Sequence, residues 1–130
     1  MKKIYWVLVV IVVLIVVWFC LRFIILGDED SWIKDERGVW IKHGNPSDTP
    51  DYVEEQQIAV SCAVDLYNQK KTENLSSQCL GTCGDYAIDI VHVPRSQEDN
   101  LVENQCEDYR LGKVSKFIEL DKFGEIVRIV

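Results

Sequence analysis

Four cysteines in the part of the chain beyond residue 28 are the residues best suited to chemistry: Cys62, Cys79, Cys83 and Cys106. An even number of cysteines in a small domain is typical of disulfides that form in an oxidising compartment. Four cysteines permit three pairings. We expect Cys62 to pair with Cys79 and Cys83 with Cys106, because each pair would join a helix to the adjoining loop or strand.

A metal site is the alternative use of the same cysteines. Cys79 and Cys83 would supply one pair of ligands, and His92 or Cys106 would complete the set. A structural zinc site normally has a second close pair of ligands, which this sequence lacks, so we expect no metal and no cofactor. Reactive cysteine pairs usually have two intervening residues, whereas three residues separate Cys79 from Cys83.

Two histidines, His43 and His92, are the other candidates for acid–base chemistry. The sequence contains no nucleophile elbow, zinc-protease helix, phosphate loop or dinucleotide-binding pattern around them. We therefore assign no catalytic residue and favour a non-enzymatic protein. The two histidines stay candidate binding residues together with Trp32 and Trp40, whose rings would lie one hairpin's width apart.

An almost unbroken apolar run covers residues 4–26, and it predicts a helix that crosses a membrane. At ~1.5 Å per residue a helix of this length spans roughly 34 Å, and a hydrocarbon core is ~30 Å thick. Arg22 is close enough to the far end to extend its guanidinium to the headgroups. Because no small-residue cleavage site follows the run, we predict an uncleaved signal anchor over residues 1–27, embedded in the lipid bilayer through residues 4–26.

The orientation of this anchor is predicted with the N-terminus cytoplasmic and the C-terminal domain outside the cell membrane. Lys2 and Lys3 precede the apolar run, although basic residues also follow it and the charge rule alone does not decide. The even number of cysteines favours an oxidising, extracytoplasmic compartment. The sequence Asn74-Leu75-Ser76 also forms a glycosylation acceptor pattern, which makes Asn74 a candidate modification site.

The domain beyond the anchor is strongly acidic. Residues 28–130 hold all 21 Asp and Glu residues and 11 of the 14 Lys and Arg residues, which gives a formal charge of −10. Such a surface repels phosphate backbones, so we expect no nucleic-acid partner.

Residues 28–130 suffice for one small α+β domain. The pattern predicts a hairpin over 32–34 and 39–42, a long helix over 50–71 with Thr49 as its N-cap, a polar loop over 72–84, a strand over 86–93, a short helix over 100–112 with a capping box at Asn100 and Glu103, and a second hairpin over 116–120 and 125–130. We expect an antiparallel sheet, made of two hairpins and a central strand, packed by the long and the short helix.

The segment Trp40-Ile41-Lys42-His43-Gly44-Asn45-Pro46-Ser47 follows the single hydrophobic helix. In this the chain resembles small uncharacterised membrane-anchored proteins of archaeal type. The resemblance covers under a tenth of the chain, and it implies a membrane-anchored topology without implying a function.

Taken together, these features predict a non-enzymatic, membrane-anchored binding or accessory module at the cell surface, with an envelope protein as the candidate partner. One alternative is a small metal- or thiol-dependent redox protein or enzyme that uses Cys79, Cys83, Cys106 and His92. The other alternative is a structural subunit of a membrane complex.

Overall fold

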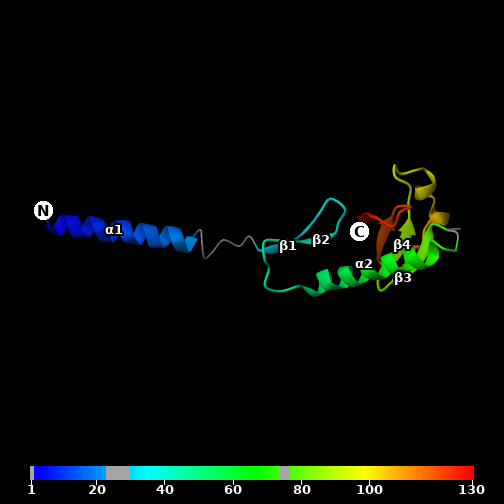
Figure 1. Ribbon diagram of the computed structural model, residues 1–130, viewed down its shortest axis with the longest axis horizontal. Helices are drawn as coiled ribbons and strands as arrows, with labels where there is room; N and C mark the ends of the chain where they lie inside the picture. Colours follow the sequence, from blue (N-terminus) through cyan, green and yellow to red (C-terminus); the bar gives the residue numbers. More distant parts are fainter. Residues whose placement is uncertain (1, 23–29, 74–76) are drawn as a thin grey trace.

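The computed structural model describes residues 2–22, 30–73 and 77–130, and its class is α+β, as predicted. The elements follow one another in the order α1 (Lys2–Cys20), β1 (Ser31–Lys34), β2 (Trp40–His43), α2 (Asp51–Lys70), β3 (Cys79–Cys83), β4 (Tyr86–Ile90), η2 (Glu98–Asn100), η3 (Val102–Asn104), α3 (Glu107–Arg110), β5 (Lys116–Leu120) and β6 (Ile126–Ile129). Figure 1 shows this order along the chain.

Helix α1 is the one helix among the described residues that is long and apolar enough to cross a membrane. None of its side chains is buried, and it lies apart from the other elements (Figure 1). Leu21 and Arg22 continue it in a π-helical turn. The predicted end of the apolar helix at Leu26, and the predicted domain boundary between residues 27 and 28, lie outside the described residues.

The main sheet has four strands in the order β3-β4-β5-β6. Strands β3 and β4 pair antiparallel, as do β5 and β6, but β4 and β5 pair parallel. The predicted all-antiparallel sheet is therefore wrong at its centre. Parallel neighbours need a crossover connection of a dozen or more residues, and residues 91–115 supply it.

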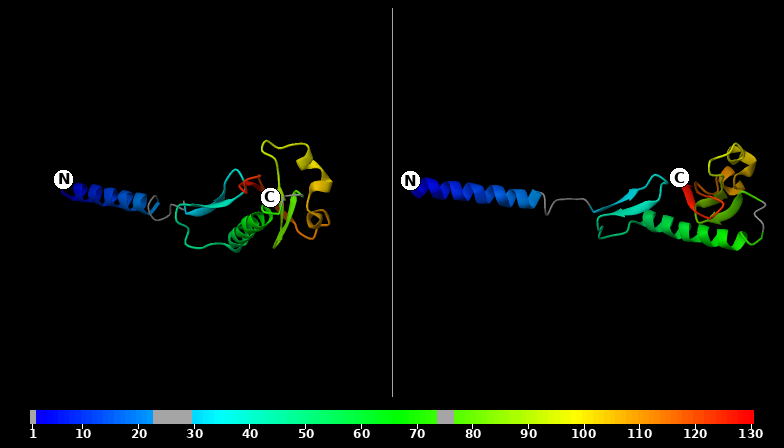
Figure 2. Two further views of the ribbon diagram at one scale, coloured as in Figure 1. Left: turned by 45° about the vertical axis from the view of Figure 1, so that its right-hand side comes forward. Right: turned by 45° about the horizontal axis from the view of Figure 1, so that its top comes forward.

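Both faces of this sheet are covered, which gives the domain three layers (Figure 2). Helix α2 packs on one face, where Ala59 and Ala63 let it approach the buried side chains of Ile88 and Ile118. The crossover segment covers the other face, where Cys106 and Val114 pack around Ala87. The alternation of side chains along β4 sends its residues to both layers.

The predicted first hairpin is confirmed as β1 and β2, but it forms a separate antiparallel pair, so the prediction that both hairpins belong to one sheet is wrong. The attachment of this hairpin to the domain depends on Gln56 of α2, which is only 3% exposed. The Gln56 side chain accepts a 2.8 Å hydrogen bond from the backbone N–H of Trp40 and donates a 2.9 Å hydrogen bond to the Gly38 carbonyl. The backbone N–H of Ile129 in β6 donates to the Arg37 carbonyl at 2.7 Å, so the hairpin turn contacts the edge of the main sheet.

Gly38 lies at this contact with φ +84°, and a Cβ built on it would collide with the Ile129 carbonyl oxygen. We expect Gly38→Ala to lower the free energy of unfolding by about 2 kcal/mol, because it combines backbone strain with a clash. Gly112 has φ +69° and nothing within 4 Å of such a Cβ, so Gly112→Ala is the matched control for backbone strain alone. Urea denaturation of both variants, followed by pulse proteolysis, checks this; equal losses would contradict the clash.

Three local predictions need correction. Helix α2 begins at Asp51 after Pro50, with no side-chain cap, so the predicted Thr49 cap is wrong by one residue. The stretch Cys79–Cys83 is strand β3 and not a loop. The predicted helix over 100–112 is split into short turns, because Leu101 is extended (φ −71°, ψ 128°) where the capping box was expected. The second hairpin is confirmed as β5 and β6.

Candidate functional site

A cavity of about 710 Å³ opens where β4 ends. Its walls come from Val91 and His92 after β4, from the crossover segment beyond Pro94, and from the turn between β5 and β6. Two apolar side chains at this cavity, Val93 and Phe123, are 66% and 70% exposed. Large apolar groups beside a concave surface are typical of a ligand site.

Asp99 accepts hydrogen bonds from three residues in the wall of this cavity. It is 5% exposed, and its carboxylate accepts hydrogen bonds from the backbone N–H groups of Ser96 (2.8 Å) and His92 (3.1 Å) and from the side-chain amide of Gln78 (2.8 Å). Burial alone would raise the pKa of this carboxyl, but the hydrogen bonds from Ser96 and His92 outweigh burial and lower the pKa to about 2. Asp99 is therefore an anion at neutral pH.

The same carboxylate orients the His92 ring. His92 Nδ1 lies 2.9 Å from Asp99 Oδ1, while 57% of the His92 side chain stays exposed. A carboxylate beside Nδ1 favours a proton on that nitrogen and leaves Nε2 directed away from Asp99. The arrangement presents an oriented imidazole ring at the cavity.

Ser96, His92 and Asp99 are the residue types of a hydrolase triad, but their geometry is different. Ser96 Oγ lies 3.1 Å from His92 Nδ1, the same nitrogen that contacts Asp99, and it also donates to Asp99 at 3.2 Å. In a triad the serine and the aspartate contact opposite nitrogens of the ring. This group therefore positions a histidine and does not activate the serine.

The cavity has more acidic than basic groups. Glu98, Glu103 and Asp121 line it, with Lys122 as the basic residue besides the histidine. An acidic rim around apolar side chains suits a ligand that carries a positive charge on an apolar body.

A row of polar residues crosses the sheet near this cavity, on the face that the crossover segment covers. Cys79 pairs with Asp89, Asp89 with Glu119, and Glu119 with Arg128 across the four strands. Glu119 is 5% exposed and lies between two guanidinium groups, those of Arg128 (3.0 Å) and Arg95 (2.9 Å). A small cavity of about 110 Å³ includes Asp89, Glu119 and both arginines among its lining residues.

The disulfides join Cys62 to Cys83 and Cys79 to Cys106, with Cα–Cα distances of 5.9 and 4.9 Å. The four disulfide cysteines are those predicted, but the expected pairing is wrong. Residues 79 and 83 would face the same side of a regular strand, and a register shift between Cys79 and Gly81 changes this. Cys83 consequently belongs to the core beneath α2, and Cys79 packs with Cys106 on the opposite face.

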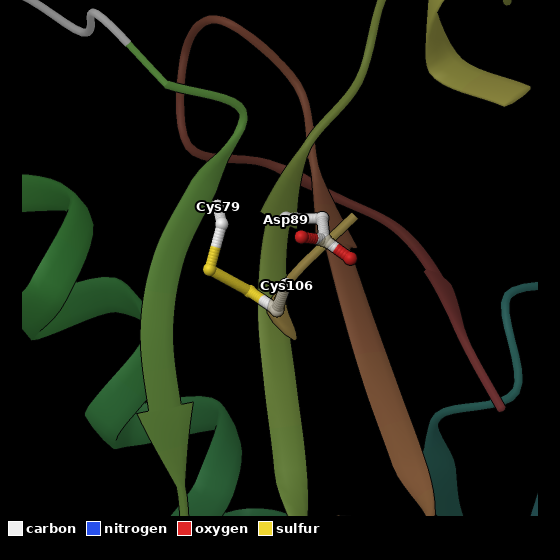
Figure 3. Close-up of side chains that lie close together, drawn as sticks. All are labelled: Cys79, Asp89 and Cys106. Atoms are coloured by element: carbon white, nitrogen blue, oxygen red, sulfur yellow. A yellow bond between two sulfur atoms is a disulfide. The ribbon is translucent and has the colours of Figure 1, made fainter. Parts of the chain in front are cut away.

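Asp89 lies against the second disulfide, as Figure 3 shows. The Sγ atoms of Cys79 and Cys106 and a carboxyl oxygen of Asp89 lie within 4.8 Å of one another. Burial and, to a smaller extent, the charge of Glu119 raise the pKa of the Asp89 carboxyl to about 6, although a hydrogen bond from the backbone of Cys106 lowers it. The buried Asp89 Oδ1 atom has no hydrogen-bond partner among the described residues.

The alternative ligand set of Cys79, Cys83, Cys106 and His92 is not assembled. All three cysteines are in disulfides, so they offer no thiolate. Among the described residues, the group of potential metal ligands that lie close together is Cys79, Asp89 and Cys106, and it contains neither Cys83 nor His92.

The predicted aromatic binding residues lie on the first hairpin and not at the cavity. Trp40 packs against Tyr52 with ring centroids 4.9 Å apart, and the Trp32 indole donates to the Asp48 carbonyl at 2.9 Å. His43 ends β2 on the same hairpin. Only His92, of the four predicted binding residues, lines the cavity. Asn74, the candidate glycosylation site, lies outside the described residues.

The structure thus defines a disulfide-linked α+β domain that follows one apolar helix and bears a histidine-lined cavity. Comparison of the chain with protein families, with curated proteins and with solved structures gives no match.

Proposed function

We propose that the protein is a single-pass, membrane-anchored binding module outside the cytoplasm, and that the cavity beside His92 holds a ligand with a positive charge on an apolar body. A basic segment of an envelope protein has this chemistry. The topology that the resemblance to archaeal-type anchored proteins implies is compatible with this proposal.

Three features support the anchored, extracytoplasmic part of the proposal. Helix α1 meets the length and composition of a membrane span. Lys2 and Lys3 precede its apolar residues, which favours a cytoplasmic N-terminus. The two disulfides suit an oxidising compartment.

The observation that carries the binding function is the construction of the cavity wall. Asp99 is buried and ionised, and it orients His92 instead of activating a nucleophile. The exposed Phe123 and Val93 offer apolar contact, and Glu98 and Glu103 offer negative charge. A preformed site of this kind binds a ligand with little loss of conformational entropy.

Titration with phenylalanyl-arginine amide tests the proposal, on the full chain in detergent micelles at pH 7.5, by isothermal titration calorimetry. We expect saturable binding that Phe123→Ala weakens about tenfold, because the exposed ring supplies apolar contact area. Leu111→Ala is the matched control, since Leu111 is 60% exposed but lies outside the cavity.

The contribution of the acidic side chains to binding is tested with the same calorimetric titration. Glu103→Gln is expected to weaken binding about threefold, and Glu107→Gln, an acid outside the cavity, to leave it unchanged. Phenylalanyl-glutamate, which reverses the probe's charge, should not bind. Equal binding of the two dipeptides, or an equal effect of Phe123→Ala and Leu111→Ala, would refute this cavity as the site.

A further inference from the structure

We propose that Cys79–Cys106 is an exchangeable disulfide that a dithiol reduces in the folded protein, and that Asp89 is the proton donor to the departing Cys106 sulfur. This chemistry goes beyond ligand binding in the cavity beside His92 and does not depend on it. Cys62–Cys83 remains a structural link.

The backbone places the three groups together. Cys79 and Asp89 are direct partners across β3 and β4, so their side chains share one face of the sheet. Cys106 comes from the crossover segment above that face, and its backbone N–H hydrogen-bonds the Asp89 carboxyl. Figure 3 shows the carboxyl directed to the Cys106 side of the disulfide.

The two sulfurs differ in exposure. Cys79 is partly exposed, whereas Cys106 is 1% exposed. An incoming thiolate therefore reaches Cys79 Sγ, and the buried Cys106 Sγ is the leaving atom.

The surroundings of Cys106 disfavour a sulfur anion. Cys106 Sγ lies 3.5 Å from the Ile88 carbonyl oxygen and 3.6 Å from that of Gly81. Both oxygens carry partial negative charge, so they would repel a thiolate and accept a hydrogen bond from a thiol. The leaving sulfur consequently needs a proton, and a carboxyl oxygen of Asp89 lies within 4.8 Å of it. The Asp89 carboxyl shares a small cavity with Glu119 of β5, Arg128 of β6, and Arg95 and Asp99 of the crossover segment. Burial, with the charge of Glu119, raises the pKa of Asp89 to about 6 and so keeps a protonated fraction available near neutral pH.

The exchange balances as follows. A thiolate of the dithiol attacks Cys79 Sγ, the bond between the two protein sulfurs breaks, and its electron pair leaves with Cys106 Sγ, which takes the proton from Asp89. The second thiol of the dithiol loses its proton and attacks the mixed disulfide, which releases Cys79 and an oxidised dithiol. Two electrons pass to the protein, and the two protons of the dithiol are used to protonate Cys79 and to restore Asp89.

Cys62–Cys83 provides an internal standard. Cys62 is partly exposed and Cys83 is 4% exposed, so this pair resembles Cys79 and Cys106 in exposure. The two disulfides differ in that the group formed with the Asp89 carboxyl includes neither Cys62 nor Cys83. The rate of reduction of Cys62–Cys83 in the same tube corrects for the thiolate fraction of the reductant at each pH.

The experiment treats the full chain in detergent micelles with dithiothreitol between pH 5 and pH 8. Acid quenching, labelling with N-ethylmaleimide and peptide mass spectrometry give the rate of each disulfide. We expect the ratio of the Cys79–Cys106 rate to the Cys62–Cys83 rate to rise about tenfold from pH 8 to pH 5. The midpoint is expected near pH 6, where Asp89 gains its proton.

In Asp89→Asn this ratio should be independent of pH, because the amide cannot donate a proton in the same way. Glu54→Gln, which changes an exposed acid on α2 outside both the cavity and the Cys79–Asp89–Cys106 group, should behave like wild type. Asp89→Ser is a second uncharged variant, and an unchanged Cys62–Cys83 rate reports that each variant is folded. A flat ratio in the wild type, the same pH dependence in Asp89→Asn, or simultaneous reduction of both disulfides would overturn the proposal.

Discussion

Asp99→Ala is expected to lower the free energy of unfolding by about 3 kcal/mol, because it leaves several buried donors without an acceptor. The donors are the backbone N–H groups of His92 and Ser96 and the side-chain amide of Gln78. The same change should abolish binding of phenylalanyl-arginine amide, since the His92 ring loses the group that orients it. Urea denaturation of the full chain in micelles, followed by pulse proteolysis, measures the loss of stability.

The pH dependence of stability gives a second readout for Asp99. Its folded pKa, about 2, lies below the ordinary value of 3.8, so the carboxylate stabilises the fold above pH 4. This contribution is lost as the pH falls from about 4 to about 2. Asp99→Ala should therefore show a smaller loss of stability over that interval than wild type.

Asp108→Ala is the matched control for this substitution. Asp108 also contacts a basic group, Lys113 Nζ at 3.1 Å, but its side chain is 42% exposed. Exposed ion pairs contribute little, so the expected loss is under about 0.5 kcal/mol. Equal losses for the Asp99 and Asp108 variants would show that Asp99 does not organise the cavity wall.

Removal of the Cys62–Cys83 disulfide is expected to have a comparable effect. In the double variant Cys62→Ala/Cys83→Ala the free energy of unfolding should fall by about 3 kcal/mol, because a link across 21 residues no longer restricts the unfolded chain. For a domain of about 100 residues this corresponds to a fall in Tm of roughly 15 °C. Thermal unfolding of the full chain in micelles measures the fall in Tm, with the fraction of folded domain at each temperature determined by its resistance to proteolysis.

Cys20→Ser is the control for this variant, since Cys20 is an exposed free cysteine in α1 and its replacement should leave Tm unchanged. A non-reducing peptide map should link Cys62 to Cys83 and Cys79 to Cys106. Recovery of a peptide that joins Cys62 to Cys79 would contradict the pairing and the role of the β3 register shift.

Elements with a local pattern were predictable from the sequence. The apolar run specified α1, and the helical spacing of Ala59 and Ala63 specified α2. The charged turns that end in Gly38 and Gly124 marked both hairpins, and both glycines have positive φ in the structure. Each of these patterns lies within a single element or turn, so no knowledge of distant contacts was needed.

Elements that depend on distant contacts were not predictable. Strand β3 contains one large aliphatic residue, Leu80, and a register shift, so it lacks the alternation of a regular strand. The parallel pairing of β4 with β5 depends on where residues 91–115 return to the sheet, and no local pattern encodes that. The disulfide pairing followed from the same shift, which is why the expected pairing failed.

The candidate sites were predictable only in part. His92 was singled out as a binding candidate, but Asp99 and Asp89 were two of 21 acidic residues with nothing in their types to distinguish them. The sequence did contain a weak indication at Asp99, because the turn-forming Pro94 between it and His92 allows the chain to fold back. Asp99 is buried and Asp89 is partly buried, and this burial is a property of the tertiary fold that the sequence does not reveal.

The contact between the first hairpin and β6 has a consequence for how molecules of this protein behave side by side. Strands at the edges of a sheet carry unpaired backbone groups that can recruit the edge of another molecule. Here the Arg37 carbonyl occupies the Ile129 N–H at one edge, and at the other edge β3 is distorted by its register shift and held at both ends by disulfides. Neither edge of the main sheet offers a long, regular template, so the architecture resists edge-to-edge aggregation even at high local concentration.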